Sequence, residues 1–190
     1  MVRSELLTLP NAITASRIVA GPACMGLLAT GEQIWAWTAL AIMIAAEASD
    51  LVDGHVARSS RQVSNFGKIL DPMADCLYRG AVFIAFVING WMPVWMLSII
   101  VWRDLAVSYL REIAELQAKT LGARASGKWK AVAQGVAQVG VVALVAVFGA
   151  AAYGDYALAV DVLLYVAVGV TAYSLVDYVA GVFNGKARAA

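Results

Sequence analysis

Six long apolar stretches dominate the sequence, and they limit the possible folds more than any other feature. They cover residues 12–30, 34–52, 69–88, 94–116, 132–152 and 156–183. A helix of about 20 apolar residues crosses the hydrocarbon core of a bilayer, so each stretch is long enough to span a membrane. Hydrophobic residues make up 62% of the 190-residue chain and charged residues 14%, unlike a water-soluble domain of this size. We therefore predict an all-α integral membrane protein with six transmembrane helices, forming one membrane-embedded domain over residues 1–190.

Lysine and arginine residues lie in alternate connections between these stretches. They are Arg3, Arg58, Arg61, Lys68, Lys119, Arg124, Lys128, Lys130, Lys186 and Arg188. The connections around residues 31–32, 89–90 and 154–155 contain neither residue type. Because positively charged loops stay in the cytoplasm, both termini are predicted to be cytoplasmic and the chain to lie in the cell inner (cytoplasmic) membrane. The formal net charge of +1 offers no basic surface for nucleic acid, and we expect no such partner.

Two pairs of aspartates lie at the predicted cytoplasmic ends of the second and third stretches. Asp50 and Asp53 are three residues apart, and Asp71 and Asp75 are four apart, so each pair shares a helix face. An antiparallel helix pair can bring the four carboxylates together, where they would repel one another or take up protons. Divalent cations remove that conflict, and oxygen ligands suit Mg²⁺ or Mn²⁺ rather than zinc. The spacing therefore predicts a site for two metal ions that can bind a diphosphate.

Glycine and arginine residues flank these carboxylates. Gly54 and Gly67 each remove a side chain beside the cluster, which permits close approach of the backbone. Arg58 lies one helical turn beyond Gly54 and can donate several hydrogen bonds to phosphate oxygens. In a structural alternative, Arg58, Arg61 and Arg79 pair with the acids, but they could neutralise only part of the charge.

The complete pattern over residues 50–75 is DxxDGxxAR, eight residues, G, three residues, D, three residues, D. It resembles the signature of the CDP-alcohol phosphotransferase family at every fixed position. That family also has six membrane helices with the motif on the second and third, so the resemblance extends over nearly the whole chain. It implies transfer of a phosphatidyl group from CDP-diacylglycerol to an alcohol, release of CMP, and a homodimer.

The resemblance also implies roles for individual residues. Asp50 and Asp71 would bridge the two metal ions, Asp53 would complete the first metal site, and Asp75 the second. Asp75 would also be the catalytic base that takes the proton from the acceptor hydroxyl. Six residues would form the CDP-diacylglycerol site: Asn11, Thr14, Gly54, Arg58, Ser64 and Gly67.

The acceptor is predicted from Arg103, Arg111, Lys128 and Lys130, which resemble segments of phosphatidylglycerophosphate synthases. These cations could bind the phosphate of glycerol 3-phosphate. A neutral acceptor would leave them without a partner near the membrane, which is costly. Inositol phosphate, inositol and phosphatidylglycerol remain alternative acceptors. A small cation transporter is a rival of another class, but its ionisable groups should run through the membrane depth, whereas here they gather at one end.

Overall fold

The computed structural model describes residues 9–60, 65–116, 119–120, 124–183 and 188–189. Between residues 49 and 69 the description covers helical backbone and not side chains. The long helices are α2 (Leu9–Ala29), α3 (Gln33–Ser60), α4 (Asn65–Ile88), α5 (Val94–Leu116), α6 (Ala125–Phe148) and α7 (Tyr153–Phe183). A short 3₁₀ turn, η1 (Ala150–Ala152), precedes α7. The two-residue strands β1 (Lys119–Thr120) and β2 (Arg188–Ala189) pair antiparallel.

Each predicted apolar stretch coincides with one long helix, so the prediction of an all-α chain with six long helices is confirmed. Several helices extend beyond the apolar residues, by most in α3, which continues to Ser60, and in α6, which begins at Ala125. Lys128 and Lys130 therefore lie on α6 itself. By length and apolar composition, two segments of the described chain could each cross a membrane, Ala125–Phe148 and Ala150–Gly181. The number of membrane spans stays a prediction.

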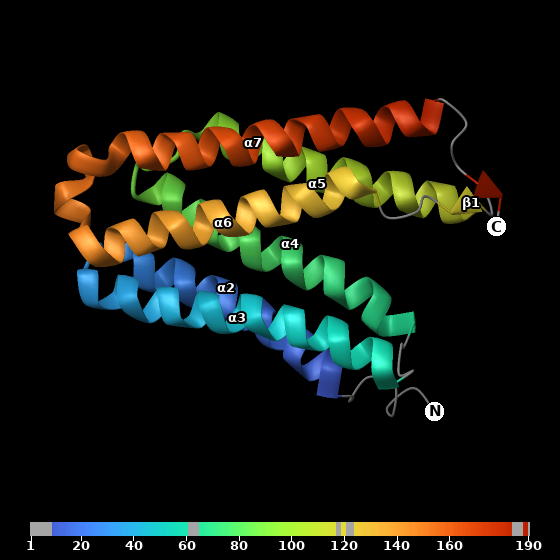
Figure 1. The fold of residues 1–190 in the computed structure, drawn as a ribbon, viewed down its shortest axis with the longest axis horizontal. Coiled ribbons are helices and arrows are strands. Elements are labelled where there is room, and N and C mark those ends of the chain that lie inside the picture. Colours follow the sequence, from blue (N-terminus) through green and yellow to red (C-terminus); the bar gives the residue numbers. More distant parts are fainter. Residues whose placement is uncertain (1–8, 61–64, 117–118, 121–123, 184–187, 190) are drawn as a thin grey trace.

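The helices form an elongated bundle in which consecutive helices run in opposite directions (Figure 1). Helix α4 packs along α2, α3 packs on α2 and α6, and α7 packs on α6 and α5. The starts of α2, α4 and α6 and the ends of α3, α5 and α7 meet at one end of the bundle, which we call the site end. At the opposite end the chain turns at Gly31, Gly90 and Gly149, whose positive φ angles of 71°, 73° and 81° favour glycine.

Apolar and polar residues are distributed unequally along the bundle. Aromatic rings pack together at the far end, where Phe86 contacts Trp91 at 5.8 Å between ring centroids and Trp91 stacks on Tyr153 at 6.5 Å. The buried charged side chains are Arg17, Arg79, Arg103, Asp104 and Lys130, and they lie outside this aromatic cluster. Many large apolar side chains are exposed on the outer surface. They include Val94, Trp102, Val136, Leu158, Val166 and Val176. An outer surface this apolar suits a lipid environment.

Candidate active site

Two of the predicted metal ligands, Asp71 and Asp75, are described, and both lie near the start of α4. Asp71 is exposed, and its Oδ1 accepts a hydrogen bond of 2.7 Å from the Thr14 hydroxyl on α2. Thr14, predicted to belong to the CDP-diacylglycerol site, therefore lies beside a predicted metal ligand. Asp75 is half-buried, and its Oδ1 accepts a hydrogen bond of 2.8 Å from Arg79 Nε.

Arg79 links Asp75 to a third carboxylate that sequence reasoning missed. Its Nη2 lies 3.2 Å from Glu47 Oε1 on α3, and its backbone carbonyl accepts a 2.8 Å hydrogen bond from Gln138 on α6. Arg79 is only 4% exposed, so losing either carboxylate would leave a buried charge partly uncompensated. Glu47 lies three residues before Asp50, on the same helix face, and this spacing could have drawn attention to it.

The remaining predicted ligands of the metals and of CDP-diacylglycerol lie in segments whose side chains are not described. The backbones of Asp50, Asp53, Gly54 and Arg58 belong to the end of α3, that of Gly67 to the start of α4 and that of Asn11 to α2. Their side chains, and the whole of Ser64, lie outside the described residues.

The carboxylates of the described residues are compatible with metal binding. Within that part of the chain, no three His, Cys, Asp or Glu side chains gather into a possible metal site, but it holds only half of the predicted ligand set. In both Asp71 and Asp75, Oδ1 has a protein partner, whereas Oδ2 has no hydrogen bond or ion pair with a described residue. One carboxylate oxygen of each therefore has no partner among the described residues, and such oxygens are the donors that Mg²⁺ and Mn²⁺ prefer. We call Asp71, Asp75, Thr14, Arg79 and Glu47 the acidic wall.

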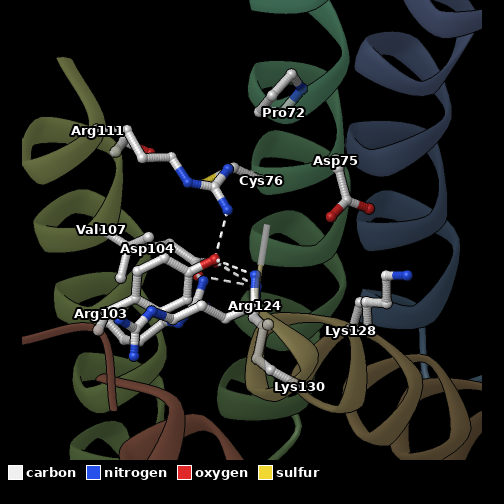
Figure 2. A pocket seen from close by; sticks show the side chains of 14 residues that line it. Pro72, Asp75, Cys76, Arg103, Asp104, Val107, Arg111, Arg124, Lys128 and Lys130 are labelled. Atoms are coloured by element: carbon white, nitrogen blue, oxygen red, sulfur yellow. Dashed lines mark hydrogen bonds and ion pairs between the residues drawn. The ribbon is translucent and has the colours of Figure 1, made fainter. Parts of the chain in front are cut away.

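A cavity of about 300 Å³ adjoins Asp75 and is lined by residues of α4, α5, α6 and α7. The four predicted acceptor-binding residues all line it: Arg103, Arg111, Lys128 and Lys130. Figure 2 shows Asp75 on α4 on one side of this space and Arg111 on α5 on the other, with Lys128 and Lys130 on α6. Arg124, which sequence reasoning treated only as a topology signal, lines the cavity too.

Asp104 compensates two of the four predicted cations. Its Oδ1 lies 3.0 Å from Arg103 Nη1 and 2.8 Å from Lys130 Nζ, and all three side chains are buried. The sequence predicts that a neutral acceptor would leave all four cations without a partner. For Arg103 and Lys130 this prediction is wrong, because Asp104 pairs with both. Asp104 is adjacent to Arg103 in sequence, but Lys130 reaches it from another helix.

Arg111 and Lys128 are different, because neither forms an ion pair with a described carboxylate. Arg111 Nη2 donates a 2.6 Å hydrogen bond to the hydroxyl of Tyr178, and its buried Nε has no hydrogen-bond partner. Lys128 is exposed at the cavity. At this part of the cavity two positive charges have no carboxylate partner among the described residues, which favours an anionic ligand.

Helix α7 supplies partners that the sequence did not reveal. Asp177 pairs with Arg124 at 2.8 Å and accepts a 2.6 Å hydrogen bond from Ser126. Tyr178 is fully buried against the guanidinium groups of Arg103, Arg111 and Arg124. We call the cations of the cavity, with Asp104, Asp177 and Tyr178, the basic wall.

Comparison with known proteins agrees with the motif. Residues 7–174 match the family model described as CDP-alcohol phosphatidyltransferase. The chain belongs to this family, which confirms the resemblance predicted from residues 50–75. The end of α7, including Asp177 and Tyr178, lies beyond the matched residues.

Individual relatives are similar over about half to two thirds of the chain. A Cereibacter sphaeroides protein named CDP-diacylglycerol–glycerol-3-phosphate 3-phosphatidyltransferase is 37% identical over 68% of this chain and 61% of its own length. A Bacillus subtilis protein of the same name is 36% identical over 70% of this chain and 75% of its own length. A Drosophila melanogaster protein, named a probable CMP-forming cardiolipin synthase, is 36% identical over 54% of this chain and 31% of its own length. The chain thus spans less than two thirds of the first and third of these proteins.

Proposed function

We propose that this chain transfers the phosphatidyl group of CDP-diacylglycerol to the hydroxyl of glycerol 3-phosphate. The products are phosphatidylglycerophosphate and CMP, and the reaction belongs to phospholipid biosynthesis. The observation that carries this proposal is the cavity beside Asp75, where Arg111 and Lys128 have no carboxylate partner among the described residues. The names of the Cereibacter and Bacillus relatives support the same acceptor.

In this proposal four aspartates carry out the chemistry, and two of them, Asp71 and Asp75, belong to the acidic wall. Asp50, Asp53, Asp71 and Asp75 hold two divalent cations, Mg²⁺ or Mn²⁺, which when bound supply neutralisation of the diphosphate. Asp75 takes the proton from the acceptor hydroxyl. The hydroxyl oxygen forms the new bond to the phosphorus of the phosphatidyl group, while the bond to the departing CMP breaks. Arg79 fixes Oδ1 of Asp75, which leaves Oδ2 free for this work.

The nucleotide lies beside the same carboxylates. Its proposed site comprises Asn11, Thr14, Gly54, Arg58, Ser64 and Gly67. The hydrogen bond from Thr14 to Asp71 supports this placement, because it joins one residue of the proposed nucleotide site to one proposed metal ligand.

The basic wall binds the acceptor phosphate. Five cationic side chains line the cavity (Arg103, Arg111, Arg124, Lys128 and Lys130) and the carboxylates of Asp104 and Asp177 pair with three of them. The cations of the cavity therefore outnumber these two carboxylates, and Arg111 and Lys128, which have no described carboxylate partner, can bind a phosphate dianion. A phosphorylated acceptor therefore fits better than free inositol. Inositol phosphate has the same charge and is the alternative acceptor to test.

The proposed setting is the inner (cytoplasmic) membrane, with six spans, cytoplasmic termini, the site facing the cytoplasm, and a homodimer as the family resemblance implies. The apolar outer surface supports the membrane setting. Single cysteines at positions 61 and 119, in a Cys24→Ala, Cys76→Ala background, should be labelled only from the cytoplasmic side. Labelling from outside alone would overturn the orientation.

The test of the function is CMP release from CDP-diacylglycerol by the purified protein with one acceptor at a time. We expect release with glycerol 3-phosphate in Mg²⁺ or Mn²⁺ and none in excess EDTA. Undiminished turnover in EDTA would contradict the metal site. Turnover with inositol phosphate, inositol or phosphatidylglycerol but not with glycerol 3-phosphate would reject the acceptor and leave the phosphatidyl-transfer chemistry standing.

A further inference from the structure

The last turns of α7 present one helix face to three arginines of the basic wall. Asp177 and Tyr178 lie three and four residues after Ser174, so both lie on the same helix face as Ser174. The Ser174 hydroxyl accepts hydrogen bonds of 3.0 and 2.6 Å from Nε and Nη2 of Arg103. Asp177 pairs with Arg124 and Tyr178 with Arg111.

Gly181 continues this face one turn further. A methyl group added at Gly181 would overlap the guanidinium group of Arg124, so the end of that flexible side chain would have to shift. Gly181 thus leaves room for Arg124 in its present position.

Tyr178 is the centre of this arrangement. Its ring centroid lies 5.5, 5.3 and 5.6 Å from the guanidinium carbons of Arg103, Arg111 and Arg124. The negative face of an aromatic ring attracts cations at such distances, which offsets part of the repulsion among the arginines. Its hydroxyl also accepts a 3.3 Å hydrogen bond from the backbone N–H of Arg124, where α6 is about to begin.

The three arginines differ in what else holds them. Arg103 pairs with Asp104, and Arg124 pairs with Asp177. Among the described residues, Tyr178 is the one hydrogen-bond partner of the Arg111 side chain. The phenol thus orients the arginine whose charge remains available for a ligand.

We propose that Tyr178 is a positioning residue that sets the affinity for the acceptor phosphate by holding Arg111 at the cavity. This inference rests on the proposed function, since it names how the same pocket recognises its acceptor. Tyr178 acts through Arg111 and leaves the metal and nucleotide sites of the acidic wall unchanged.

The test is Tyr178→Phe, which keeps the ring and removes the oxygen that accepts from Arg111. Loss of this hydrogen bond to a charged group should raise the KM for glycerol 3-phosphate about tenfold. The kcat and the KM for CDP-diacylglycerol should stay close to wild type. Tyr173→Phe is the matched control, because Tyr173 lies on the same helix and is 66% exposed. An unchanged KM for the acceptor in Tyr178→Phe would overturn the proposal.

A double-mutant cycle separates positioning from a general structural effect. If Tyr178 acts through Arg111, adding Tyr178→Phe to Arg111→Ala should cause no further rise in the acceptor KM. Additive effects, or parallel losses for both substrates, would show that Tyr178 does not act through Arg111. If the wild type ignores glycerol 3-phosphate, the proposed function fails by itself. The affinity for inorganic phosphate then tests the role of Tyr178 in positioning Arg111. If Tyr178→Phe binds phosphate as tightly as the wild type, that role is rejected.

Discussion

The cavity is lined mainly by the basic wall, and the acidic wall reaches it at Asp75, but the two walls are held together in different ways. On the acidic wall, Asp71 and Asp75 lie one turn apart on α4, and Thr14 and Arg79 each hold one oxygen of them. The other oxygen of each carboxylate has no partner among the described residues. The basic wall is assembled from α5, α6 and α7, and most of its charges are paired across helices. The acidic wall therefore suits cations as ligands, and the basic wall suits an anion. If the proposed function holds, we expect catalysis and acceptor recognition to depend on different residues and to be impaired separately.

The largest expected effect comes from Asp75→Asn, which removes the proposed base from the acidic wall. General-base catalysis contributes about 10²–10⁴-fold, so kcat should fall by that factor. Binding of CDP-diacylglycerol should be largely kept, because three carboxylates remain. Asp161→Asn, an exposed aspartate elsewhere on α7, makes the same chemical change as a control. Steady-state kinetics and nucleotide binding measure both effects, and near-normal turnover would reject the base assignment.

A large loss of stability is expected when Asp104 is removed from the basic wall. Asp104→Asn leaves the buried cations Arg103 and Lys130 without their shared carboxylate. Breaking a buried pair from one side costs about 3 kcal/mol or more in the free energy of unfolding. Thermal unfolding of the purified protein should show a lower Tm than in the exposed control Asp155→Asn. Equal Tm values would mean that this pairing does not stabilise the wall.

Arg111→Ala should impair binding of the acceptor without impairing binding of CDP-diacylglycerol. Losing a charge-assisted contact of about 1.5–3 kcal/mol corresponds to a rise of roughly one to two orders of magnitude in the KM for glycerol 3-phosphate. The KM for CDP-diacylglycerol should change little. A matching rise for both substrates would show that the two walls do not act separately.

The smallest effect is expected at Thr14, whose hydroxyl donates to Asp71. Thr14→Val removes this hydrogen bond while keeping the shape of the side chain. Because Asp71 is exposed, we expect only about a threefold rise in the Mg²⁺ concentration for half-maximal activity. Thr14→Ser keeps the hydroxyl and should behave as wild type. A loss in Thr14→Ser as large as in Thr14→Val would argue against the hydrogen bond as the cause.

The four predicted metal ligands were easier to predict from sequence than the basic wall, because they follow local helical spacing. The pairs Asp50–Asp53 and Asp71–Asp75 could be found by counting residues, and the family match supports the motif to which they belong. The role of Glu47 was not predicted, because its partner, Arg79, lies 32 residues away along the chain.

On the basic wall, the cations were predicted from short segments, but their partners were not. Lys130 reaches Asp104 over 26 residues, Arg124 reaches Asp177 over 53, and Arg111 reaches Tyr178 over 67. Such pairings depend on how α5, α6 and α7 pack, which the spacing along one helix cannot reveal. The six helices themselves were predictable, because each apolar stretch has the length of a helix that crosses a membrane.

We propose that the predicted metal ligands bind the metal ions beside the nucleotide and that the basic wall binds the acceptor. Binding of labelled glycerol 3-phosphate with and without metal tests this separation most directly. Equilibrium dialysis of the purified protein should be run in Mg²⁺ and in excess EDTA, with CDP as the parallel ligand. Because the basic wall is held by protein contacts, the Kd for glycerol 3-phosphate should change little in EDTA, whereas binding of CDP should be lost. Loss of both ligands in EDTA would contradict the account, since acceptor recognition would then depend on the acidic wall.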